Sequence, residues 1–94
     1  MTAVDVVRFR SAFAGGRGVL TAELARRPEP RWSELFELNR PRYTALFEET
    51  PSLVEDAIVV PVRAHELTTA EMALIQLVGA TNWLFANSPD GDGL

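Results

Sequence analysis

The chain has 94 residues, a length that fits one domain with a modest hydrophobic core. Hydrophobic residues make up 47% of the sequence, which argues against global disorder, and the absence of cysteine excludes disulfides, thiolate catalysis and cysteine-bound metal sites. The formal net charge of −4 argues against a nucleic acid partner.

Charge is distributed unevenly along the chain. Residues 1–42 contain eight arginines and five acidic residues, whereas residues 43–94 contain one arginine and eight acidic residues. Such asymmetry occurs in nucleic-acid-binding arms, in head-to-tail pairing of complementary halves, and in folds whose basic and acidic segments pack together. We favour the third, intramolecular arrangement, because most charge patterns belong to solvated faces.

The N-terminal segment, residues 2–14, predicts a helix. Val6, Phe9 and Phe13 have the i, i+3, i+7 spacing that places apolar side chains on one helix face. The Gly-Gly pair that follows would end this helix, since glycine readily adopts the left-handed conformation found after helix C-termini. Asp5 and two arginines interrupt any apolar leader, so we expect a cytoplasmic protein.

Prolines bound the next segments. Residues 18–27 fit either a short helix or a strand through residues 18–22, and the following proline ends either element. Residues 28–51 predict short helices hinged at prolines, because proline is favoured in the first turn of a helix. One of these helices begins near Pro30 and has four residues at helical spacing: Trp32, Leu35, Phe36 and Asn39.

Residues 51–67 are compatible with two structures. As a helix, the segment runs to about Val60 and becomes irregular at Pro61. As a strand, residues 57–63 form a β-branched run that Pro61 would confine to the edge of a sheet. Such a strand would pair with residues 18–24 or with a second copy of the chain. We prefer the helix.

Residues 68–87 form the longest apolar run and predict the principal helix. Thr68 and Glu71 have the spacing of a capping box, and the apolar residues after them cover most of the helix circumference, which is typical of a buried helix. The run is too short and too polar for a membrane span. Gly79 either lets another backbone approach or is simply tolerated. Residues 88–94 predict a flexible tail.

These elements predict an all-α fold, in which five to six mostly short helices surround the capped C-terminal helix. Residues 1–87 would form a single helical domain. The alternative is an α+β fold with an edge strand near residues 57–63.

Side chains that could carry chemistry are sparse. His65 is the only histidine and a weak catalytic candidate. No other residue stands at metal-ligand spacing from it, so we expect neither a metal nor a cofactor. Aromatic residues and arginines concentrate around Trp32 and Tyr43, a combination that anchors interfaces or ligands.

Two functions fit this sequence. The first is a small non-catalytic protein–protein interaction module that forms a homodimer, because a core of this size is marginal and the last helix has surplus apolar surface. The second is a small enzyme or binding protein with an apolar small-molecule pocket between helices, where an arginine would hold an anionic group. Six residues are candidates for the interface or the ligand site: Trp32, Arg42, Tyr43, Ile75, Gly79 and Trp83.

Overall fold

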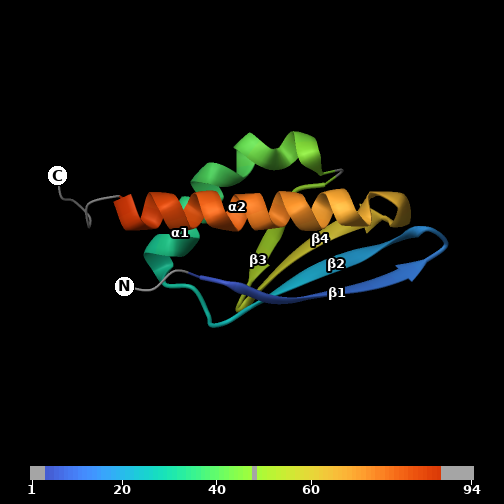
Figure 1. Cartoon of the computed structure of the whole chain (residues 1–94), viewed down its shortest axis with the longest axis horizontal. Coiled ribbons are helices and arrows are strands. Elements are labelled where there is room, and N and C mark those ends of the chain that lie inside the picture. The colour runs from blue at the N-terminus through green and yellow to red at the C-terminus, as the bar shows by residue number, and fades with distance from the viewer. Residues whose placement is uncertain (1–3, 48, 88–94) are drawn as a thin grey trace.

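The computed structural model describes residues 4–47 and 49–87 and shows an α+β fold, in which a long helix covers one face of an antiparallel sheet (Figure 1). The strands are β1 (Val6–Ala14), β2 (Arg17–Leu24), β3 (Ser52–Val54) and β4 (Ala57–Arg63); the α-helices are α1 (Pro30–Asn39) and α2 (Leu67–Asn87); the 3₁₀ segments are η1 (Arg40–Leu46) and η2 (Ala64–Glu66). The strand order is β1-β2-β4-β3. The all-α prediction is therefore wrong, and the α+β alternative is closer. The predicted tail lies outside the described residues.

β1 and β2 form a hairpin where the sequence predicted a helix followed by a helix or a strand. Gly15 and Gly16 connect them with φ angles of 64° and 83°. Two consecutive residues with positive φ make the tight turn that best matches the twist of a two-stranded ribbon. The Gly-Gly pair therefore reverses the chain between strands and does not end a helix.

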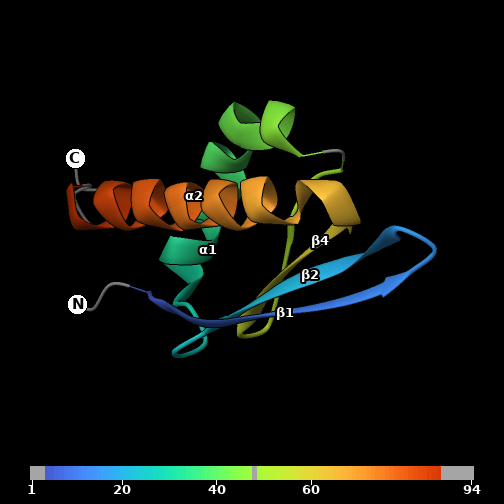
Figure 2. The ribbon, with the colours of Figure 1, turned by 45° about the vertical axis from the view of Figure 1, so that its right-hand side comes forward.

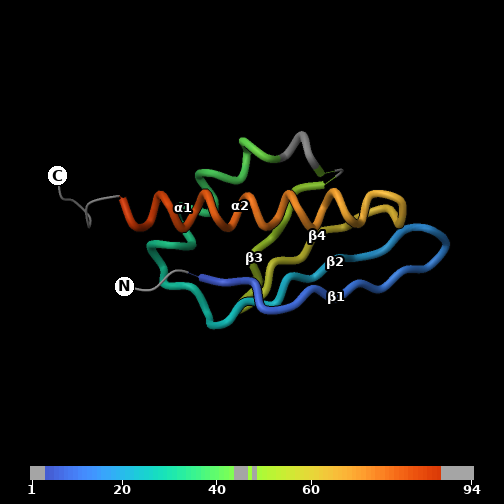
Figure 3. The backbone as a smooth tube through the Cα atoms, viewed as in Figure 1, coloured from blue at the N-terminus to red at the C-terminus, as the bar shows by residue number. Residues whose placement is uncertain are grey.

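A bulge in β1 explains why this strand resembled a helix in sequence. The pairing with β2 shifts register between Val6 and Arg8, which leaves Val7 as an extra residue that is 61% exposed. Beyond the bulge, alternate residues point to the same face, so Phe9 and Phe13 lie together. The extra residue brings Val6 to that face as well, and the resulting spacing imitates a helical stripe. Figure 3 traces the course of β1 beside β2.

β4 lies inside the sheet, between β2 and β3, and is not the edge strand of the predicted alternative. Its partner is β2 of the same chain, with Leu20 opposite Val60. The pairing with β3 reaches only to Val59, so the side of β4 that faces away from β2 is open at Pro61. A proline is tolerated there because it interrupts no hydrogen bond with a strand on that side.

The helices form a second layer on one face of the sheet, and the core lies between the two layers. α2 lies over the sheet, α1 passes across α2 at a steep angle, and η1 also contacts α2 (Figure 2). The predicted helix that begins near Pro30 is confirmed as α1, and the predicted helix over the long apolar run is confirmed as α2. α2 begins at Leu67, so Thr68 lies inside the helix and is not its N-cap. No described helix, the 21-residue α2 included, combines the length and hydropathy that a bilayer span needs.

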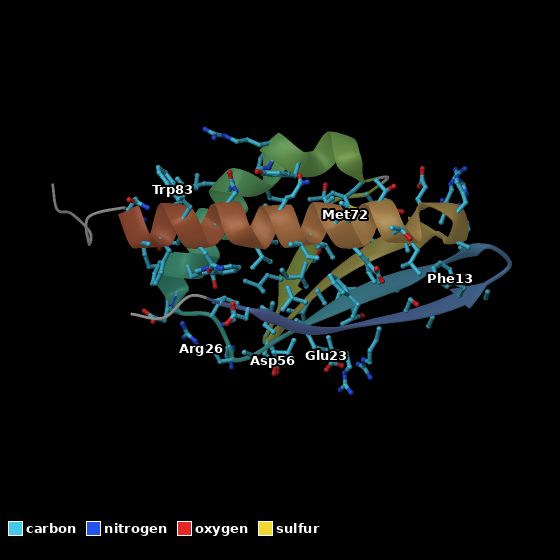
Figure 4. The ribbon with its side chains drawn as sticks, in the orientation of Figure 1. Phe13, Glu23, Arg26, Asp56, Met72 and Trp83 are labelled. Atoms are coloured by element: carbon cyan, nitrogen blue, oxygen red, sulfur yellow. The ribbon has the colours of Figure 1, made fainter. Side chains whose placement is uncertain are left out.

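The opposite face of the sheet carries an ion-pair cluster. Glu23 points away from α2 (Figure 4) and pairs with Arg8 at 2.8 Å and with Arg10. Three further arginines pair with glutamates close in sequence: Arg26–Glu29, Arg31–Glu34 and Arg40–Glu37. All five arginines therefore form ion pairs with glutamates that also lie within residues 1–42. The prediction was that basic segments pack against the acidic segments of residues 43–94, and these ion pairs are more local.

Candidate functional site

A pocket of about 230 Å³ lies between the end of α1, the segment η1 and the C-terminal half of α2. α1 gives way to η1 next to Pro41, because proline has no N–H to continue the α-helical ladder. On α2, the lining positions are spaced i, i+3 and i+4 and therefore share one helix face. Six described residues line the pocket: Asn39, Arg42, Tyr43, Ala80, Trp83 and Leu84.

Asn39 gives this pocket its most unusual feature. Its residue exposure is only 3%, and its side-chain Nδ2 is buried without a hydrogen-bond acceptor among the described residues. Leaving a buried donor unpaired costs about 1–3 kcal/mol, so native proteins rarely retain one without a reason. An acceptor supplied by a bound molecule would satisfy this amide.

The pocket is also lined by one more polar side chain and by two aromatic ones. Arg42 is exposed, Tyr43 is half-buried, and Trp83 is 64% exposed although it lies beside apolar neighbours on α2. Trp83 projects from α2 on the side where η1 lies (Figure 4). An exposed indole, a phenol and a guanidinium together suit a flat ligand with an anionic group.

Comparisons with family models, with curated proteins and with solved structures found no match to this chain. The function must therefore be argued from the geometry of the site. Within the described residues, no group of three or more histidine, cysteine or acidic side chains is placed to hold a metal ion.

The structure brings three of the predicted site residues together in this pocket, namely Arg42, Tyr43 and Trp83. It places the others elsewhere. Ile75 and Gly79 lie nearer the middle of α2 and face β1. His65 is exposed in η2, 18 positions before Trp83, which corresponds to roughly 27 Å along a helix. It is therefore remote from the pocket.

Trp32 belongs to the core, not to a binding surface. It is fully buried, and its ring stacks on Phe36 with a centroid distance of 5.7 Å. Its Nε1 donates to Oδ1 of Asn82 at 2.8 Å. The same amide oxygen accepts from the backbone N–H of Val4 at 2.9 Å, and Asn82 Nδ2 donates to the carbonyl of Val4 at 2.8 Å. We call these three groups the Asn82 clamp.

Sequence reasoning missed Asn39, Ala80 and Leu84 as site residues. Asn39 was assigned to a helix face correctly, but its position before Arg40-Pro41 suggested only the end of a helix. Its burial arises from the packing of α1 against α2, which one chain segment does not reveal. A polar residue on an otherwise apolar helix face is the one feature that could have identified it.

A second, larger depression lies on the other side of α2. It has a volume of about 400 Å³, and residues Val4–Phe9 of the β1 region form one wall. Ile75, Val78 and Gly79 of α2 form the other wall. We call it the β1–α2 groove. Apart from Asp5 and Arg8, its lining residues are apolar, and none of the lining residues has a buried polar side-chain atom without a hydrogen-bond partner among the described residues.

Proposed function

We propose that this chain is a small-molecule binding protein whose site is the pocket between α1, η1 and α2. The observation that carries the proposal is Asn39, a residue that lines the pocket and whose buried side-chain Nδ2 has no hydrogen-bond acceptor among the described residues. Ligand sites combine apolar walls with a few polar groups that fix orientation, and this pocket has that composition. Its volume of about 230 Å³ limits the ligand to a compound smaller than a typical drug.

The lining residues specify a planar compound with an acceptor group. Trp83 and Tyr43 would contact its apolar ring, since flat rings stack well on aromatic side chains. Asn39 would donate to its acceptor, and Arg42 would attract it if the acceptor is a carboxylate. The six lining residues include no carboxylate and no histidine, so the proposal ends at binding and includes no reaction. A cytoplasmic location stays a prediction from the sequence.

The first experiment tests the unpaired amide without a ligand. In Asn39→Leu, an apolar group of similar size replaces a donor that has no described partner, so we expect the free energy of unfolding to rise by about 1 kcal/mol. Asn82→Leu is the matched control, because it removes an amide with three hydrogen bonds and should lower stability. Urea denaturation followed by circular dichroism measures both. A destabilised Asn39→Leu would mean that the amide is satisfied inside the protein.

The second experiment tests binding with benzoate as the probe and benzyl alcohol as its uncharged analogue. The chain has two tryptophans, one buried and one in the pocket, so their two indole N–H signals in an NMR titration report separately. We expect benzoate to shift the Trp83 signal, to leave Trp32 unchanged, and to bind more tightly than benzyl alcohol. Asn39→Leu should abolish the shift. An equal shift in Asn39→Leu would refute the assigned role of this residue.

A further inference from the structure

β1 is a long strand at the edge of the sheet, and no described segment covers its outer side. It pairs with β2 on one side only (Figure 1). A strand edge exposes backbone N–H and C=O groups that can pair with another chain. β1 also exposes apolar side chains, since Val7 is 61% and Phe13 is 38% accessible. Proteins protect such edges with charges, bulges or covering segments, and an apolar edge that stays exposed can pair with another chain.

The β1–α2 groove continues this apolar surface from the strand onto the helix. Ile75 is 53% exposed, and Met72, one turn earlier on α2, is 58% exposed. A Cβ atom built on Gly79 would meet no atom within 4 Å, so open space lies above the helix at this position. No described residue fills the groove, so an apolar group that reaches over the β1 edge would fit there.

We infer that a second copy of this chain pairs antiparallel with β1 about a twofold axis at Ser11, and that its Phe13 covers the β1–α2 groove. The bulge ends regular pairing at Arg8, and the turn ends it at Ala14. Ser11 is the central residue of positions 8–14, so a twofold axis at Ser11 pairs each of these seven residues with a residue of the second copy. The two sheets would then form one continuous sheet, with both α2 helices on the same face.

Charge along β1 favours the same register. With the axis at Ser11, Arg8 lies opposite Ala14 of the second copy, and Arg10 lies opposite its Ala12. The arginine stems can then extend over small side chains while both guanidinium groups stay paired with Glu23 of their own chain. An axis at Arg10 would oppose two Arg10 residues, and an axis at Phe9 would oppose Arg8 and Arg10. Like charges directly opposite each other destabilise a strand pair.

The groove side of this pairing is aromatic. Phe9, Ser11 and Phe13 share the face that looks toward α2, because alternate residues of a strand point the same way. Phe9 of one copy therefore lies opposite Phe13 of the other, twice per dimer, and such aromatic pairs stabilise a sheet beyond the area that they bury. Phe9 lines the groove beside Ile75, so Phe13 of the second copy would cover it.

Cysteine scanning tests the register directly, because the chain contains no cysteine. In Ser11→Cys the two thiols would lie on directly opposed residues, whose Cα atoms are about 4.5–5.5 Å apart, within the range of a disulfide. Ala12→Cys is the matched control, because its two copies would lie diagonally, about 7–8 Å apart. We expect mild oxidation to cross-link Ser11→Cys and to leave Ala12→Cys as free monomers on a denaturing gel. Equal cross-linking, or none at Ser11, would overturn the register.

Light scattering after size exclusion tests the dimer itself. We expect the unmodified chain to be a dimer and Phe13→Arg to raise its dissociation constant at least tenfold. Val54→Arg is the control, because Val54 is 53% exposed on the opposite edge strand, β3, and its substitution should change nothing. A chain that stays monomeric at about 1 mM overturns the inference. The groove and the proposed ligand pocket flank different sides of α2, so this result is independent of the benzoate titration.

Discussion

Replacing Asn82 with alanine should destabilise the protein more than any other exchange of a polar residue on α2. The substitution removes three hydrogen bonds of the Asn82 clamp. It also leaves the N–H groups of Val4 and Trp32 without their acceptor, and both residues are fully buried. A hydrogen bond contributes about 1 kcal/mol net to stability, and each buried donor left without an acceptor adds a desolvation cost. Because Asn82 itself is only half-buried and water can enter, we expect a total loss of about 2–4 kcal/mol.

Thermal and urea denaturation, followed by circular dichroism, measure this loss. For a domain of this size, about 2–4 kcal/mol corresponds to a fall in Tm of at least about 10 °C. Asn87→Ala is the matched control, because it is the same exchange on the same helix and its exposed amide donates one hydrogen bond within the described residues, to the carbonyl of Trp83. We expect it to stay within about 0.5 kcal/mol of the unmodified chain. If the two variants have equal stability, the hydrogen bonds of Asn82 to Val4 and Trp32 do not stabilise the fold.

Two further predictions concern the turns and pairing of the strands. Gly18→Ala should cost about 1–3 kcal/mol in urea denaturation, because its new Cβ would clash with the carbonyl oxygen of Ala12 and β1 would have to move. Glu55→Gly should raise stability by about 0.5–1 kcal/mol, since Glu55 connects β3 to β4 with a φ of 54°, a conformation that favours glycine. A loss of stability in Glu55→Gly would show that its side chain is needed in the turn.

Local patterns in the sequence predicted both α-helices of the structure, although they also predicted helices in two regions, residues 2–14 and 51–60, where the structure has strands. α2 begins at Leu67, one residue before the predicted cap, and continues to Asn87, the last described residue. The four residues of α1 that were assigned to one face are its buried residues. Both successes have the same cause: helical hydrogen bonds join residues close in sequence, and the apolar spacing therefore reports the packed face directly.

The strands were harder to predict, because each depends on a distant partner. The bulge at Val7 gave β1 the spacing of a helix. The α+β alternative predicted a strand at residues 57–63, whereas the preferred prediction was a helix. Pairing with β2, which is distant in sequence, makes this segment a strand. The candidate site shows the same limit. Arg42, Tyr43 and Trp83 were identified from residue type, whereas Asn39 acquires its importance only when α1 packs on α2.

The Asn82 clamp also has a consequence for folding. Each hairpin closes through a two-residue turn and forms from neighbouring residues, whereas the clamp joins positions separated by 78 residues. Contacts of such long range form after the local ones, because closing a long loop costs more entropy. We therefore expect Asn82→Ala to leave the folding rate nearly unchanged in stopped-flow experiments and to accelerate unfolding. The clamp would then determine how long each folded molecule persists, not how quickly it forms.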